Sequence, residues 1–119
     1  MRFLSKLIIL LALMAVPLSG AWAHAVLIES TPAVNGTAAG PKVALALRYN
    51  SRIDHLRSRL TLTLPDHSTK VLPIADSAPE DQLVTSVDLP PGEYSLRWQV
   101  LAVDGHITRG DVPFTVSGN

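Results

Sequence analysis

From residue 25 onward, apolar side chains alternate with polar ones over short stretches, and no long segment has a convincing helical period of 3.6 residues. The clearest examples run from Leu60 to Leu64 and from Tyr94 to Val100, where every second side chain is apolar. Such alternation is typical of β-strands that bury one face. We expect seven strands, over residues 25–29, 43–48, 60–64, 70–74, 82–88, 94–100 and 112–116.

Proline, glycine, asparagine and aspartate separate these stretches. Residues 65–68 and 90–92 have the composition of turns, residues 35–41 that of a loop, and residues 50–55 that of a loop with a helical turn. Short strands with turn signals between them predict a single all-β domain, an antiparallel β-sandwich with Trp98 in its core.

The first 23 residues have the features of a secretory signal peptide. Two basic residues, Arg2 and Lys6, precede an apolar run over residues 7–16, and small residues occupy positions 21 and 23. The alternative is an uncleaved membrane anchor, but the run is shorter than the roughly 20 residues that span a bilayer. We therefore expect cleavage after residue 23, and a domain over residues 24–119 that begins with His24 and is not inserted in a membrane.

The chain contains no cysteine, and its two methionines, Met1 and Met14, both lie in the predicted signal peptide. Residues 24–119 therefore contain no sulfur, which excludes a thiolate metal site and a cysteine nucleophile. Without Arg2 and Lys6 they hold 8 basic and 10 acidic residues, so there is no case for nucleic acid or anionic lipid as a partner. Any metal site must use nitrogen and oxygen ligands, which in a tetragonal arrangement suit Cu(II) or Ni(II).

His24 and the motif Asp104-Gly105-His106 are the candidate metal ligands. Alternate residues of an extended chain project to the same side, roughly 6.5–7 Å apart at Cα, so Asp104 and His106 can lean onto one ion. Asp-Gly is also a common turn signal, which makes the motif weak by itself. As the first residue of a mature chain, His24 offers an α-amine and an imidazole that can chelate one metal through two nitrogens.

Recognisable motifs occur together at both ends of residues 24–119: His24-Ala25-Val26-Leu27, Ser30-Thr31-Pro32-Ala33, the run from Leu89 to Trp98, Asp104-Gly105-His106, Gly110 and Phe114-Thr115-Val116. With these motifs the chain resembles the CopC family of periplasmic copper-binding proteins over essentially all of residues 24–119. The match is specific at the ends, whereas the middle has the general pattern of a β-sandwich.

The resemblance implies a seven-stranded Greek-key β-sandwich or barrel, Ig-like or cupredoxin-like, that binds one Cu(II) ion in the periplasm. The implied ligands are the α-amine and imidazole of His24, the carboxylate of Asp104 and the imidazole of His106. Lacking the methionine-rich Cu(I) site of many members, the chain is similar to the Cu(II)-only type. The resemblance further implies a monomer without enzymatic activity that sequesters or delivers copper, and a partner of the CopD type, an inner-membrane copper transporter.

Members of the family commonly carry a Ser-Glu-Pro-like segment after the second strand, whose glutamate hydrogen-bonds near the copper. This chain has Arg48-Tyr49-Asn50-Ser51 there, without an acid in register. Tyr49 and Asn50 are the alternatives for that contact.

Two other functions remain open from the sequence. Oxidative polysaccharide monooxygenases also hold copper through an N-terminal histidine, but they are much larger and present a flat aromatic face, and residues 24–119 contain few aromatic side chains. A β-sandwich interaction module with incidental histidines is the second alternative.

The remaining histidines and an arginine cluster have simpler interpretations. His55 and His67 lie in polar loop or turn contexts, so we expect exposed side chains rather than ligands of a second site. Arg52, Arg57 and Arg59 are expected to form a solvated face that pairs with Asp54, and a docking surface for a partner is the alternative.

Overall fold

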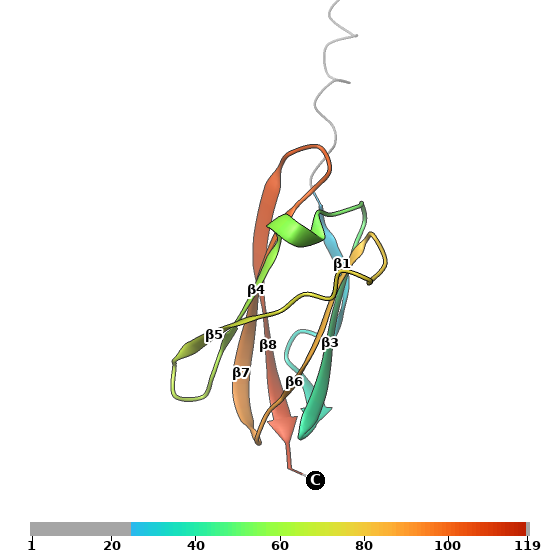
Figure 1. Cartoon of the computed structure of the whole chain (residues 1–119). Coiled ribbons are helices and arrows are strands. Elements are labelled where there is room, and N and C mark those ends of the chain that lie inside the picture. The colour runs from blue at the N-terminus through green and yellow to red at the C-terminus, as the bar shows by residue number, and fades with distance from the viewer. Residues whose placement is uncertain (1–24, 119) are drawn as a thin grey trace, which may run out of the picture.

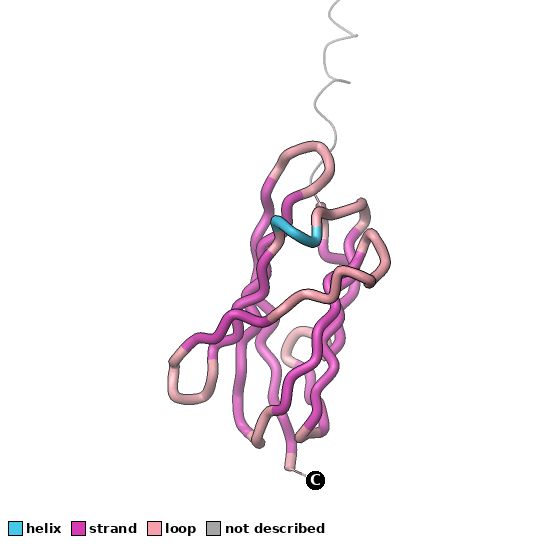
Figure 2. Tube along the Cα trace, viewed as in Figure 1, coloured by secondary structure: helices cyan, strands magenta, loops and turns pink. Residues whose placement is uncertain are grey.

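The computed structural model describes residues 25–118, which form two β-sheets that face each other across a shared core (Figure 1). The three-stranded sheet has the order β1 (Leu27–Thr31), β3 (Lys42–Tyr49), β6 (Gln82–Asp88). The five-stranded sheet has the order β2 (Gly36–Ala39), β8 (Ile107–Ser117), β7 (Gly92–Leu101), β4 (Arg59–Thr63), β5 (Thr69–Leu72). Figure 2 shows that strands and loops make up almost all of this region, with one short helical turn.

The core lies between the sheets and is built by the alternation that the sequence predicts. In β3 the inward side chains are Val43, Leu45, Leu47 and Tyr49, each 1% exposed. Trp98 of β7 is also buried, and its ring meets that of Tyr49 edge-to-face, with 5.3 Å between the ring centroids. The predictions of a β-sandwich and of Trp98 as a core residue are therefore confirmed.

The strand count and the pairing differ from the prediction. Residues 25–118 form eight strands rather than seven, because β2 occupies residues that were expected to be a loop. β2 runs parallel to β8, so the five-stranded sheet is mixed rather than wholly antiparallel. Its four residues, Gly-Thr-Ala-Ala, carry no large apolar side chain and give no alternation to read. Pairing with the end of β8 holds this strand in place, and local sequence does not.

A helical turn is present as η2 (His55–Arg57), which begins at the last of the residues 50–55 where one was expected. The carboxylate of Asp54 caps it by accepting hydrogen bonds from the backbone N–H groups of Leu56 (2.9 Å) and Arg57 (3.1 Å). The predicted signal peptide and His24 lie outside the described residues. Within residues 25–118, no helix is long and apolar enough to cross a membrane.

Candidate metal centre

One end of the sandwich brings together the start of β1, η2 and the loop between β7 and β8 (Figure 1). The β7–β8 loop is closed by two backbone hydrogen bonds, from the N–H of Ala102 to the carbonyl of His106 and from the N–H of Gly105 to the carbonyl of Ala102, each 2.9 Å long. Gly105 has φ +93°, a left-handed conformation that glycine adopts without a Cβ penalty. This loop carries Asp104 and His106.

The side chains of Asp104 and His106 contact each other directly. One carboxylate oxygen, Oδ1, accepts the backbone N–H of His106 at 3.1 Å, and Oδ2 lies 3.0 Å from its imidazole Nδ1. The expected proximity is therefore present, but its expected cause was wrong. The two residues lie in a turn, where the bend at Gly105 and the bond from Oδ1 bring them together, and not on one face of an extended strand.

The hydrogen bonds to Asp104 also fix its charge. The backbone N–H of His106, helped by the imidazole of the same residue, holds the pKa of the Asp104 carboxyl below its usual value. Asp104 and His106 therefore present a carboxylate oxygen donor beside an imidazole at the surface, with side chains 29% and 51% exposed. This pairing of hard oxygen and borderline nitrogen donors suits a divalent transition metal such as copper.

The chain enters the fold beside this loop. The carbonyl of Ala25, a residue only 3% exposed, accepts a hydrogen bond of 3.0 Å from the hydroxyl of Thr108. Thr108 stands two residues after His106 on β8. The first described residue is therefore tied to the strand that begins directly after the candidate histidine.

Asn50 holds the next residue, Val26, on its other side. The side-chain oxygen of Asn50 accepts the N–H of Val26 at 2.8 Å, and the backbone N–H of Asn50 donates to the carbonyl of Val26 at 3.1 Å. Of the two residues proposed from the sequence for a supporting contact, Asn50 thus contacts the entering chain. Tyr49 instead points into the core, where burial raises the pKa of its hydroxyl far above the usual value.

The segment after Asn50 also contacts the β7–β8 loop through backbone groups. The N–H of Val103 donates to the carbonyl of Arg52 at 3.3 Å, and Ile53 forms an isolated antiparallel bridge with Ala102. The β3–η2 segment therefore contacts both the entering chain and the loop with Asp104 and His106. Sequence reasoning missed Thr108 and this linking role, because hydrogen bonds between residues distant in the chain leave no local pattern.

The part of the chain that the structure describes contains no cluster of three or more histidine, cysteine or acidic side chains able to hold a metal. Of the three predicted ligands, the structure brings Asp104 and His106 together, and His24 lies outside the described residues. Two side chains alone do not complete a metal site, so the part played by His24 stays a prediction.

The other candidates are confirmed in part. His67 is exposed, as expected, in the turn after Pro65. His55 is half-buried rather than exposed, because its Nε2 lies 3.1 Å from the carbonyl of Pro79 and 2.8 Å from that of Gln82. Arg57 lies 4.0 Å from Asp54, as predicted.

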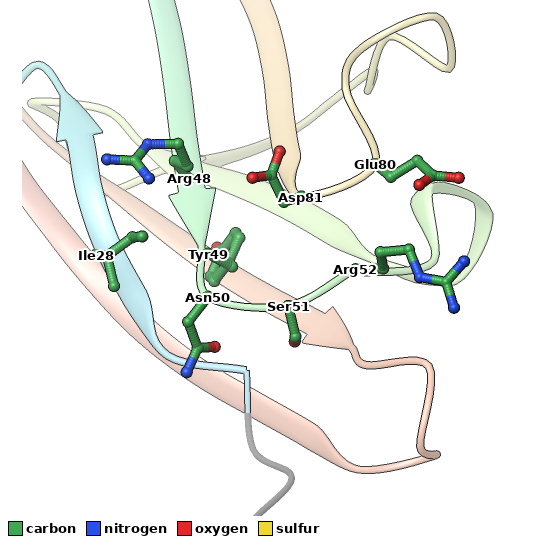
Figure 3. Close-up of a pocket in the computed structure, with 8 residues that line it drawn as sticks. All are labelled: Ile28, Arg48, Tyr49, Asn50, Ser51, Arg52, Glu80 and Asp81. Carbon is green, nitrogen blue, oxygen red and sulfur yellow. The ribbon is translucent and has the colours of Figure 1, made fainter.

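A shallow hollow of about 540 Å³ lies beside the β3–η2 segment (Figure 3) and is lined by Ile28, Arg48, Tyr49, Asn50, Ser51, Arg52, Glu80 and Asp81. Its charged side chains do not converge on one point: Arg48 pairs with Glu29 at 3.2 Å, whereas Arg52 and Glu80 point away from Arg48 in Figure 3. The described residues that line the hollow therefore do not form a second candidate metal site.

Comparisons with known proteins identify the family and the fold. The family model for the CopC domain matches residues 27–117. Protein YobA of Escherichia coli strain K12 is 32% identical over 99 residues, which cover 80% of each chain. The crystal structure of CopC from Methylosinus trichosporium OB3b covers 81% of this chain and 96% of its own, with a TM-score of 0.72 and 23% identity, a likeness of fold. PcoC, a methionine-rich copper resistance protein from Escherichia coli, covers 80% of this chain and 100% of its own, with a TM-score of 0.65 and 27% identity.

Proposed function

Because this chain belongs to the CopC family, we propose that it is a copper-binding protein of the periplasm that holds one Cu(II) ion through His24, Asp104 and His106. The observation that carries this proposal is the hydrogen bond between Thr108 and the carbonyl of Ala25. It ties the residue next to His24 to the strand that begins directly after His106. Consecutive Cα atoms are about 3.8 Å apart, so a residue directly before Ala25 is joined to the chain at this end of the sandwich.

Each ligand has a distinct part in the proposed site. After cleavage behind residue 23, the α-amine and imidazole of His24 form a chelate with two nitrogens. His106 adds a third nitrogen, and Asp104 adds an oxygen with a negative charge. Three nitrogens and one oxygen suit the tetragonal geometry of Cu(II). The contact between Asp104 and His106 keeps both side chains in place before the metal arrives, in the manner of outer contacts that orient metal ligands.

The absence of sulfur favours Cu(II) over Cu(I). PcoC is described as methionine rich, whereas residues 24–119 of this chain contain neither methionine nor cysteine. Cu(I) prefers thiolate and thioether ligands. The proposed role is therefore to sequester or deliver oxidised copper, without catalysis. We further propose export by the signal peptide over residues 1–23, a monomer, and an inner-membrane copper transporter of the CopD type as the partner.

The test compares the protein that starts at His24 with the same protein that keeps Ala23 before it. Cu(II) affinity is measured by competition with a chelator, and electron paramagnetic resonance reports the ligands. We expect tight binding with a tetragonal, nitrogen-rich spectrum for the native start, and far weaker binding for the extended chain. Equal binding by the two proteins contradicts a role for the α-amine.

A second comparison tests the side chains. His106→Ala should weaken Cu(II) binding strongly, whereas His67→Ala, which removes an exposed histidine from the turn after Pro65, should leave the affinity unchanged. Equal losses in both variants contradict the assignment of His106.

A further inference from the structure

The arginines of the described region fall into two groups. Three form ion pairs with a carboxylate: Arg48 with Glu29 at 3.2 Å, Arg57 with Asp54 at 4.0 Å and Arg97 with Asp111 at 3.4 Å. The other three, Arg52, Arg59 and Arg109, form no ion pair with any carboxylate of residues 25–118. The arginine cluster expected from the sequence is therefore divided, because Arg57 is its only member that pairs with Asp54.

Arg59 and Arg109 lie in one row across the outer face of the five-stranded sheet. Gln99 of β7 pairs with Arg59 of β4 on one side and with Arg109 of β8 on the other. Their neighbours Leu60 and Trp98 are buried in the core, so the side chains of the row project from the opposite face. Neighbouring strands are about 4.7–4.9 Å apart, which puts the Cα atoms of the two arginines about 10 Å apart.

The contacts inside the row leave its positive charge without compensation. The Nε of Arg109 donates to the side-chain oxygen Oε1 of Gln99 at 2.8 Å, and this amide is neutral. The next outward side chain on β8, Asp111, already pairs with Arg97. This area of the sheet therefore presents three guanidinium groups and one carboxylate, and like charges placed close together cost the isolated domain free energy.

An apolar pair borders the row on the side of the β7–β8 loop. Leu101 and Ile107 pair with each other as the next outward positions of β7 and β8, and Ile107 is 50% exposed. Arginine beside exposed apolar side chains is a composition typical of protein–protein interfaces, where arginine is enriched and lysine is depleted.

We propose that the row of Arg59, Gln99 and Arg109 is a docking surface for an extended acidic segment of a partner protein. Alternate side chains of an extended segment project to one side, roughly 6.5–7 Å apart, so two acidic residues with one residue between them match the spacing of the two long arginine side chains. Guanidinium groups bind carboxylates through paired, charge-assisted hydrogen bonds. The side-chain amide of Gln99 adds N–H donors between them.

The size of the row favours a protein segment over other anionic partners. Recognition of anionic lipid uses clusters of four to eight basic residues, and binding to nucleic acid uses contacts with many phosphates. Two unpaired arginines in a row instead match a pair of carboxylates. Under the proposed function, a partner docked here lies next to the loop with Asp104 and His106, but the docking itself does not need the metal.

The test follows the amide chemical shifts of the copper-free mature protein by nuclear magnetic resonance. The probe is a short synthetic peptide in which glutamate alternates with threonine. The same peptide with glutamine in place of glutamate tests the need for charge, and sodium sulfate tests whether a free anion suffices. Arg59→Gln, Arg109→Gln and the double variant are compared with Arg52→Gln, which removes an exposed, unpaired arginine from the β3–η2 segment, outside the row (Figure 3).

We expect the glutamate peptide to shift the amides of Arg59, Gln99 and Arg109. Binding should be clearest at about 0.01 M salt, where the Debye length is about 30 Å, and weaker at about 0.15 M, where it is about 8 Å. Each single variant of the row should weaken peptide binding about two- to fivefold, the range for one exposed ion pair, and the double variant about tenfold. Arg52→Gln should leave the affinity unchanged.

Shifts that lie outside the row, or an equal loss of binding in Arg52→Gln, would overturn the proposal by assigning the binding to overall charge. It would also be overturned if the glutamine peptide bound equally well, or if sulfate at the same charge concentration shifted the same amides equally. Phosphatidylglycerol vesicles that bind through the row when the peptide does not would assign the row to a membrane surface instead. Because copper is absent throughout, failure of the peptide to bind is distinct from failure of the proposed function.

Discussion

Thr108→Val tests whether one hydrogen bond holds the entering chain at the candidate site. Valine has nearly the shape of threonine, so the substitution removes the hydroxyl that donates to the carbonyl of Ala25 at 3.0 Å and leaves the packing nearly as it is. Thr115→Val is the matched control, because it is the same substitution on the same strand at an exposed position. Both variants keep the β-propensity of β8.

The size of the effect follows from the hydrogen bond and from what remains after its loss. A neutral hydrogen bond contributes about 0.5–1.5 kcal/mol net, and the carbonyl of Ala25 can reach water if the chain end frays, so we expect a cost of about 1 kcal/mol. That cost lowers the equilibrium between docked and frayed chain ends about fivefold. Asn50 still holds Val26 by two hydrogen bonds, so the chain end is loosened and not released.

Amide hydrogen exchange measured by nuclear magnetic resonance reads this equilibrium directly. The N–H of Val26, which donates to the side chain of Asn50, should lose about fivefold of its protection in Thr108→Val and none in Thr115→Val. The Cu(II) affinity of the mature protein should fall by at most about fivefold, because only the docked fraction is ready to bind. Unchanged protection of Val26 in Thr108→Val would refute the reasoning, since the entering chain would then be held without this bond.

Three further predictions concern the fold itself. Gly110→Ala should cost about 1–3 kcal/mol in urea unfolding, because a Cβ at this position would lie 2.6 Å from Cε2 of Trp98; a native midpoint would contradict this packing. Tyr94→Phe removes the hydroxyl that donates to the carbonyl of Pro90 at 2.7 Å and should cost about 0.5–1.5 kcal/mol by the same measurement, and no loss would mean that this corner is not stabilising. Burial raises the pKa of Tyr49, so the free energy of unfolding should be at its full value below the ordinary tyrosine pKa of about 10 and fall as the pH rises above it. Ultraviolet titration should accordingly detect the Tyr49 phenolate only as the protein unfolds, and a Tyr49→Phe variant should lose less stability at alkaline pH.

The fold could be predicted from the sequence wherever one strand face is buried and the other is not. β3, β4 and β7 have strict alternation of buried and less buried positions, because each packs one face on the core. β2 escaped prediction because its residues are small and its strand conformation depends on the distant end of β8. A parallel pairing of this kind is a property of the assembled sheet, which a window of local sequence does not contain.

The candidate site shows the same division between local and distant causes. Asp104 and His106 could be found because they are close in the sequence and of metal-binding types, although a turn brings them together and a strand does not. Thr108 and Asn50 carry common polar side chains with no distinctive spacing. Their importance comes from contacts with the entering chain, more than twenty residues away in each case. Such contacts become visible only when the two sheets are in place.

The proposed copper site also explains why the entering chain is held so close to the first residue. The nitrogen of His24 is an amide, without a basic lone pair, until the bond after residue 23 is cut; only then is it an amine that can bind copper. Under the proposed function, the precursor therefore has one nitrogen ligand fewer than the mature protein, and full affinity arises only on export. Thr108 and Asn50 hold Ala25 and Val26 by hydrogen bonds that do not depend on what precedes them. Under the proposed function, cleavage one residue earlier would place the α-amine on Ala23, about 3.8 Å of chain away from His24, and cleavage one residue later would remove His24. Under the proposed function, the position of the cut therefore decides metal binding, since only a cut directly before His24 leaves a free amine and an imidazole on that one residue.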